Sequence, residues 1–259
     1  MILKLLILST LYYTARGNHL HQHNKFCSER LAALLLKRPA YEFAMNILDR
    51  VALSEEAHFV FSPLSTWLQL SALAEGATGE TFKEIWKITK HHQRRCIKLK
   101  LNRLLHHHIS ELSEEYKRKS LIVIDKYVRV KPQYIKDVQR FYGVKVFRKN
   151  FNYPETAAKE LNSYIEKGMN GTIVNSFYVD DFNYETVSLL LSDNVLFRSA
   201  WKFPFSTAFT SVEKFQSNDG GHLGNVNMMS VTGYFNTTEM RSINTKVLEI
   251  PCLDDLNIT

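Results

Sequence analysis

A nearly apolar run from Leu64 to Ala74 predicts a buried helix. Leu, Ala, Ser and Thr dominate this run, with Trp67 and Gln69 as its bulkier members. Ser62 suits the capping position before it, and Pro63 suits the first helical position, where a missing N–H costs nothing. Gly76 is expected to end the helix, and Gly79-Glu80-Thr81 to open another. Because so little of its surface is polar, we expect the helix to be buried on most sides.

Residues 94–112 predict an amphipathic helix instead. One stripe of this helix is apolar and includes His108, with Ile97, Leu101, Leu104, Leu105 and Leu112. Around the other side lie Arg95, Lys98, Lys100, Arg103, His106 and His107. The formal net charge of the chain, +7, is thus partly concentrated here. A cationic face of this kind attracts polyanions through its summed field, although an ordinary solvated face of a basic protein has the same pattern.

The whole pattern favours one α+β domain. Helices come first, and apolar strands such as residues 187–191 follow, mixed with further helices. The chain has 259 residues and is 45% hydrophobic, as expected for a globular protein with a sizeable core. It has no Gly/Ser linker, Pro-rich tract or internal repeat. We therefore place a single domain over residues 18–259.

Residues 1–17 have the layout of a secretory signal peptide. Lys4 lies near the start, an apolar stretch runs from Leu5 to Tyr13, and small residues follow. The stretch is too short to span a bilayer, and a buried N-terminal helix is the alternative. Three glycosylation sequons, at Asn170, Asn236 and Asn257, are consistent with export. We expect a secreted, extracellular glycoprotein with no membrane span.

The chain shows no enzyme motif. It has no G-x-S-x-G, H-E-x-x-H or G-x-x-x-x-G-K-[ST] sequence. The cluster Gly220–Gly224 is expected to be a loop. His106, His107 and His108 point about 100° apart on a helix, so they cannot converge on one ion, and His92 with Cys96 is too few ligands for zinc. We expect no catalysis, no metal, no cofactor and no nucleic-acid partner.

Four segments, in order along the chain, carry a family resemblance. The first runs from Phe61-Ser62-Pro63-Leu64-Ser65 to Gly76-Ala77-Thr78-Gly79-Glu80-Thr81, and it resembles the second helix of the serpin family. Leu161-Asn162 with Tyr164, Glu166, Gly171 and Ile173 resembles its helix F. Asn194-Val195-Leu196-Phe197 through Trp201-Lys202-Phe203-Pro204-Phe205 resembles the end and exit of the third strand of sheet A. Phe215, Val226-Asn227-Met228-Met229, Gly233 and Tyr234-Phe235 follow at serpin-like spacing, so the resemblance covers roughly residues 30 to 259.

The resemblance implies a fold and several site residues. The expected fold has N-terminal helices around a large sheet A, with parts of sheets B and C. Ser62, Ser65 and Asn194 match a polar shutter beneath sheet A, and Trp201 matches the breach where the inserting loop enters. The purely structural alternative makes Ser62 a helix cap, Asn194 a satisfied buried amide and Trp201 core packing.

The resemblance also bears on the cysteines and on the basic helix. In an oxidising compartment Cys27 and Cys96 could pair, as in some serpins, whereas three separate thiols are the alternative. Cys252 would then be free or pair outside the chain. The basic segment corresponds to helix D, which binds sulfated polysaccharides in several serpins. The candidate residues for a glycosaminoglycan are Arg94, Arg95, Lys98, Lys100 and Arg103.

Serpin inhibition needs a bait loop with a Glu-, Gly-, Thr- and Ala-rich hinge, and no segment matches it. Glu75-Gly76-Ala77-Thr78 is only superficially similar, because it lies between two helices. We therefore expect a divergent, C-terminally truncated serpin, by family an inhibitor of serine proteases, monomeric, and non-inhibitory as it stands. The alternative is a non-inhibitory binding module for sulfated polyanions on a serpin-like scaffold.

Overall fold

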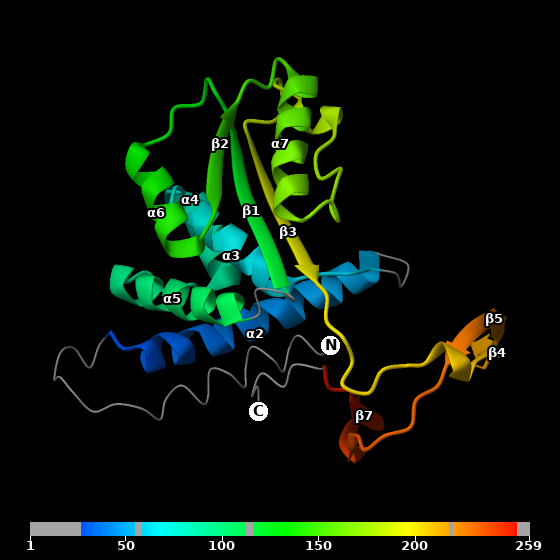
Figure 1. Cartoon of the computed structure of the whole chain (residues 1–259). Helices are drawn as coiled ribbons and strands as arrows, with labels where there is room; N and C mark the ends of the chain where they lie inside the picture. The colour runs from blue at the N-terminus through cyan, green and yellow to red at the C-terminus, as the bar shows by residue number, and fades with distance from the viewer. Residues whose placement is uncertain (1–26, 55–58, 112–115, 218–219, 253–259) are drawn as a thin grey trace. The chain divides into compact units, whose positions relative to one another are not determined.

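The structure is a computed structural model, and it describes residues 27–54, 59–111, 116–217 and 220–252 (Figure 1). The described residues fall into two compact units, one ending at Phe197 and one beginning at Arg198. The predicted signal peptide, Leu112 and Asn257 lie outside the described residues. No helix in the described ranges is long and apolar enough to cross a membrane.

The helices of the first unit begin with a long N-terminal one. They are α2 (Glu29–Ser54), α3 (Pro63–Ala74), α4 (Gly79–Thr89), α5 (Arg95–Glu111), α6 (Pro132–Tyr142), α7 (Pro154–Gly168) and the 3-10 helix η2 (Val179–Phe182). Helix α3 is buried as predicted: Trp67 is 2% exposed and its indole Nε1 donates to the Thr89 carbonyl oxygen at 2.7 Å.

The ends of α3 differ from the sequence prediction in two ways. Ser62 takes the capping position, but its hydroxyl makes no cap hydrogen bond and donates to Ser65 Oγ at 3.1 Å instead. The helix ends at Ala74, and Gly76 is not left-handed. A Cβ on Gly76 would lie 2.8 Å from Cε2 of Tyr134, so the close approach of that ring requires glycine here.

A three-stranded sheet forms the centre of the first unit, and the prediction of an α+β fold is confirmed. Its strands are β1 (Tyr116–Asp125), β2 (Lys145–Lys149) and β3 (Leu189–Phe197), in the order β2-β1-β3. Strand β1 pairs in parallel with β2 and antiparallel with β3. As expected, β3 ends at Phe197.

The two faces of this sheet carry different layers. Leu121 and Val123 of β1 join the core cluster that includes Leu161 and Ile165 of α7, all fully buried. Side chains alternate along a strand, so Ser120 and Ile122 face the opposite side. There Gln69 of α3 donates a hydrogen bond to Ser120. The sheet therefore lies between α7 and α3 (Figure 1).

The second unit consists of two antiparallel hairpins and short 3-10 turns. Its strands are β4 (Thr210–Gln216), β5 (His222–Met229), β6 (Asn236–Met240) and β7 (Thr245–Glu249), with η3 (Thr207–Phe209) and η4 (Arg241–Ile243). Strand β4 pairs with β5 and β6 with β7. The loop expected over Gly220–Gly224 is wrong in part, because β5 already begins at His222.

His91 is a buried histidine between α4 and α5, only 3% exposed. Thr89 Oγ1 donates to the Ile85 carbonyl oxygen, so it can only accept from His91 Nδ1, 2.7 Å away. The Gln93 amide donates to His91 Nε2 at 2.9 Å. Both ring nitrogens are thus satisfied in the neutral form. Burial lowers the pKa of His91 to about 4, and Lys98 and His92 add to this against an opposing effect of Glu75.

This histidine predicts acid sensitivity. Its folded-state pKa of about 4 lies below the ordinary value of about 6.5, so the unfolded chain takes up the proton first. The contribution of His91 to the free energy of unfolding is therefore fully present above pH 6.5 and falls as the pH drops toward 4. We expect the free energy of unfolding to be about 2 kcal/mol lower at pH 5 than at pH 8 because of His91. Urea unfolding of the wild type and of His91→Gln checks this.

The substitution His91→Gln is expected to flatten this part of the pH dependence. His222→Gln, at an exposed position of β5, is the matched control and should leave it unchanged. If wild type and His91→Gln lose stability equally between pH 8 and pH 5, the histidine is not responsible.

Candidate functional site

Strand β3 carries three consecutive polar residues, Ser192, Asp193 and Asn194, in an otherwise apolar sequence. One long edge of β3 pairs with β1 from Leu189 to Phe197. Within the described residues, no strand pairs with its other edge. The polar residues of β3 are held by three separate elements, and these contacts make up the candidate site.

Gln69 of α3 forms hydrogen bonds with both strands, β1 and β3. Its side-chain Nε2 donates to Ser120 Oγ at 2.9 Å, to the Leu121 carbonyl oxygen at 3.3 Å and to the Ser192 carbonyl oxygen at 2.7 Å. The residue is 4% exposed, and within the described chain its Oε1 has no hydrogen-bond partner. Sequence reasoning missed this role. The signal was an amide inside a nearly apolar helix, because a buried amide requires partners.

Arg118 and Asp193 form an ion pair across β1 and β3. Arg118 Nε lies 3.0 Å from Asp193 Oδ1, and Nη2 lies 2.5 Å from Oδ2. Their side chains are only 9% and 10% exposed. Ser120, directly opposite Asp193 in the ladder, also donates to Oδ2 at 3.3 Å. Burial raises the pKa of Asp193, against the opposing effects of Arg118 and Ser120.

Asn194 links β3 to the segment that follows α7. Its Oδ1 accepts from Ser176 Oγ at 2.6 Å, and its Nδ2 donates to Ser192 Oγ at 2.9 Å. The side chain of Asn162, on α7, forms hydrogen bonds with backbone groups of the same segment. Its Oδ1 accepts from the N–H groups of Ser176 and Phe177 at 3.0 and 2.9 Å, and its Nδ2 donates to the Phe177 carbonyl oxygen at 2.8 Å.

The residues predicted for the shutter and breach fall in three places. Ser62 donates a hydrogen bond to Ser65 in the first turn of α3. Asn194 forms hydrogen bonds with Ser176 and Ser192, so it belongs to a different hydrogen-bonded group. Trp201 belongs to the second unit, where it forms a β-bridge with Cys252 and is 39% exposed.

The predicted polyanion face of α5 is largely neutralised by the protein itself. Arg95 lies 3.2 Å from Asp137, and Lys100 and Arg103 lie 3.7 and 3.8 Å from the same Glu29 carboxylate oxygen. Arg94 is exposed just before the helix.

Lys98 corrects the sequence expectation. Its side chain is 11% exposed and pairs with Glu75 at 2.5 Å, and its Nζ lies 5.1 Å from the centre of the Phe141 ring. The Tyr142 hydroxyl donates to the same Glu75 oxygen at 2.7 Å. The sequence pattern of α5 alone does not reveal this burial, because the contacts come from Glu75, directly after α3, and from Phe141 of α6. Lys98 is therefore not part of a solvent-facing cationic surface.

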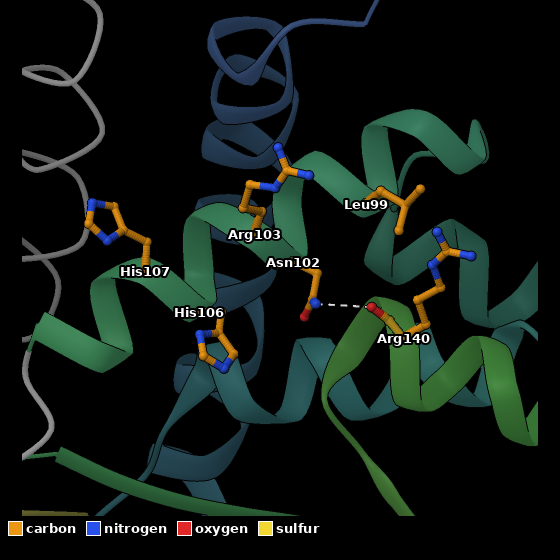
Figure 2. Close-up of a pocket in the computed structure, with 6 residues that line it drawn as sticks. All are labelled: Leu99, Asn102, Arg103, His106, His107 and Arg140. Carbon is orange, nitrogen blue, oxygen red and sulfur yellow. Dashed lines mark hydrogen bonds between the residues drawn. The ribbon is translucent and has the colours of Figure 1, made fainter.

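A polar hollow of about 670 Å³ lies beside α5 and α6 (Figure 2). Its lining residues are Leu99, Asn102, Arg103, His106, His107 and Arg140. Asn102 Nδ2 donates to the Arg140 carbonyl oxygen at 2.9 Å. Figure 2 shows His106 and His107 pointing in different directions, so these side chains do not converge on a ligand. In the described part of the chain, no three potential metal ligands gather.

The structure joins Cys27 and Cys96 as a disulfide, with 6.0 Å between their Cα atoms. The bond ties Cys27, two residues before the start of α2, to the first turn of α5. Cys252 is a free, half-buried thiol.

Two of the predicted glycosylation sites lie within the described residues. Asn170 is exposed and has a φ of 51°. Asn236 is exposed on β6, where its Nδ2 donates to Glu249 at 2.8 Å.

The buried ion pair predicts a strongly non-additive pair of substitutions. Arg118→Met leaves Asp193 buried without its cation, so we expect it to lower the free energy of unfolding by about 3–5 kcal/mol. Arg118→Met with Asp193→Leu removes both charges and should recover most of that loss. Urea unfolding of the two single variants and the double variant measures the coupling.

The exposed pair Lys83–Glu80, 69% and 80% exposed, is the matched control. The corresponding substitutions there should change stability by less than about 1 kcal/mol and add simply. Additive effects at Arg118 and Asp193 would contradict the interpretation that the pair anchors β3.

Comparison with known proteins places this geometry in a family. The serpin (serine protease inhibitor) profile matches residues 39–259. Alpha-1-antitrypsin of Sus scrofa is 26% identical over 90% of this chain and 54% of its own length. Protein Z-dependent protease inhibitor of Pongo abelii is 29% identical over 83% of this chain and 49% of its own length. The chain therefore spans about half the length of these relatives.

Solved structures share the fold. Mouse protein-Z dependent protease inhibitor superposes with a TM-score of 0.75 at 22% identity, covering 86% of this chain and 60% of that one. Native protease nexin-1 with heparin gives 0.71 at 18% identity, covering 84% and 61%. The sheet β2-β1-β3, its covering helices and the family profile agree, and the chain belongs to the serpin family.

Proposed function

We propose that this chain provides the strand-accepting sheet of a secreted serpin-type inhibitor of serine proteases. One observation carries the proposal: β3 is anchored to β1, α3 and the segment after α7, while no described strand pairs with its other edge. Serpin inhibition uses such an edge, because the cleaved bait loop inserts into sheet A as a new strand. The insertion releases stored strain and distorts the captured protease.

Each polar contact has a distinct part in this proposal. Gln69 and the Arg118–Asp193 pair keep β3 attached to β1, so an entering strand meets a fixed template. The Ser176–Asn194 hydrogen bond holds the segment after α7 on β3, and we assign it as the contact that must yield for insertion. Ser62 and Ser65, bonded to each other at the start of α3, retain the proposed shutter role, and Trp201 retains the proposed breach role.

The inhibitory loop itself is not recognisable in these 259 residues. The hinge-like Glu75-Gly76-Ala77-Thr78 lies between α3 and α4, and Glu75 is tied to Lys98 and Tyr142. We therefore propose that a polypeptide of this sequence alone is monomeric and does not trap a protease. The Cys27–Cys96 bond supports the proposal of an oxidising, extracellular setting.

A second candidate function is binding of a sulfated polyanion. The α5 face supplies Arg94 and the exposed, partly neutralised Arg95 and Arg103. A structural neighbour, protease nexin-1, was solved with heparin. The carboxylates beside Lys100 and Arg103 weaken this candidate, because they reduce the field that attracts a polyanion.

Incubation with trypsin-, chymotrypsin- and elastase-like proteases tests the inhibitory proposal. Denaturing gels should show cleavage products or intact chain, but no covalent complex. A full-length inhibitory serpin, mixed with the same enzymes, controls for protease activity. An SDS-stable complex of the 259-residue chain would overturn the proposal that it is non-inhibitory.

A further inference from the structure

The connection 90–94 between α4 and α5 contains two adjacent histidines (Figure 1). His91 is 3% exposed, and His92 is half-buried. Nδ1 of His92 accepts a hydrogen bond from the backbone N–H of Arg94 at 3.0 Å. Arg94 lies directly before α5, and its carbonyl oxygen accepts from the N–H of Lys98 at 3.1 Å. His92 therefore supports the start of α5, while His91 anchors the connection beneath it.

The hydrogen bonds of His91 require a neutral ring. Its Nδ1 donates to Thr89 Oγ1, so its Nε2 is the acceptor for the Gln93 amide. The same amide nitrogen donates to the His91 carbonyl oxygen at 3.3 Å. A proton on Nε2 would face an N–H group, and turning the amide around would place its oxygen against the carbonyl oxygen. Gln93 therefore cannot keep both contacts once His91 is charged.

The contact of His92 is lost on protonation in the same way. A proton on Nδ1 removes the acceptor, and the N–H of Arg94 then has no partner in the side chain of His92. Burial, and then the charges of Arg94 and Lys98, lower the pKa of His92 from its ordinary value. The folded connection thus disfavours the charged form of both neighbouring histidines.

The elements packed around His91 offer little to stabilise its charged form. Helix α4 places the ring of Phe82 edge-on to the imidazole, with 6.3 Å between the ring centres. The carboxylate that faces His91 belongs to Glu75, directly after α3. Lys98 of α5 pairs with this carboxylate at 2.5 Å, and the Tyr142 hydroxyl of α6 donates to it at 2.7 Å. Glu75 is therefore already engaged by other groups.

The connection also holds α3 and is itself tied at its far side. The Thr89 carbonyl oxygen, two residues before His91, accepts the buried indole N–H of Trp67 on α3. Cys96, in the first turn of α5, is joined to Cys27. Release of the connection would loosen the Trp67 contact and the first turn of α5. The disulfide would still keep α5 attached to the residues before α2, so the opening stays local.

We propose that the connection 90–94 is an acid-operated latch, which opens when His91 and His92 become charged and frees the first turn of α5 while the sheet stays folded. Histidines that are neutral in one state and charged in the other serve as switches in mildly acidic surroundings. This inference goes beyond protease inhibition and does not depend on it, because the opening is measured on the chain without a protease.

The direction of the pH effect follows from the two states of His91. In the open form the ring has its ordinary pKa of about 6.5, whereas the closed form holds it at about 4. The open form therefore takes up the proton first, and the ratio of open to closed chains rises as the pH falls below 6.5. Between pH 7.5 and pH 5, His91 alone raises this ratio about thirtyfold. His92 changes it in the same direction.

Hydrogen exchange at pH 7.5 and pH 5 detects such an opening even when few chains are open. Rates are divided by the intrinsic exchange rates at each pH, which gives protection factors. We expect the protection of segment 90–98 to fall at least about thirtyfold at pH 5. The buried residues 121–124 of β1 should stay within about threefold. Equal losses in both segments, or unchanged protection of segment 90–98, would overturn the proposal.

Three variants connect the effect to the histidines. His91→Gln with His92→Gln should remove the pH dependence of segment 90–98, and thermal unfolding checks that this variant is folded. Gln93→Glu changes an exposed residue and gives a charged His91 Nε2 an acceptor, so the loss should shrink to roughly a few-fold. His106→Gln, at an exposed position of α5, is the matched control and should behave as the wild type.

The Gln93→Glu variant keeps the proposal testable if the double variant does not fold. A loss of protection in Gln93→Glu as large as in the wild type would show that His91 does not operate the latch. A loss abolished by His106→Gln would place the sensor elsewhere, and this too would overturn the proposal.

Discussion

The Arg118–Asp193 ion pair fixes β3 against β1, and the first unit is arranged around that attachment. Two charges only about a tenth exposed are costly to bury, and they are tolerated because they satisfy each other with paired hydrogen bonds. Ser120 connects this pair to Gln69, whose amide reaches both strands from α3. Polar contacts that water cannot readily replace therefore hold β1, β3 and α3 together at the centre of the sheet.

The two long edges of β3 differ in their pairing. Toward β1 it has a continuous ladder, and on its other edge no described strand is present. An unpaired edge is a liability for most proteins, because its N–H and C=O groups can template another strand. Serpin inhibition inserts a new strand into this sheet. In the proposed function, the segment after α7, held by Asn162 and bonded to Asn194 through Ser176, is the element that controls access.

Local patterns in the sequence predicted α3 and its burial, because both depend on residues close together in the chain, whereas the end of β3 was predicted from the family resemblance. Gln69 was noted only for its size, and Arg118 and Asp193 were not predicted at all. Their pairing joins residues 75 positions apart and depends on the register of β1 against β3, which no local pattern contains. The prediction for Lys98 failed for a related reason, since its burial comes from Glu75, directly after α3, and from Phe141 of α6.

Hydrogen exchange along β3 in the 259-residue chain tests the central claim most directly. In an antiparallel pair, alternate residues direct their N–H groups toward the partner strand. If β3 is anchored to β1 and open on its other edge, protection from Leu189 to Phe197 should alternate. Amides facing β1 should exchange at least about a hundredfold more slowly than their neighbours. Uniform protection along the strand would show that its second edge is covered, and uniformly fast exchange would show that the anchoring to β1 does not hold.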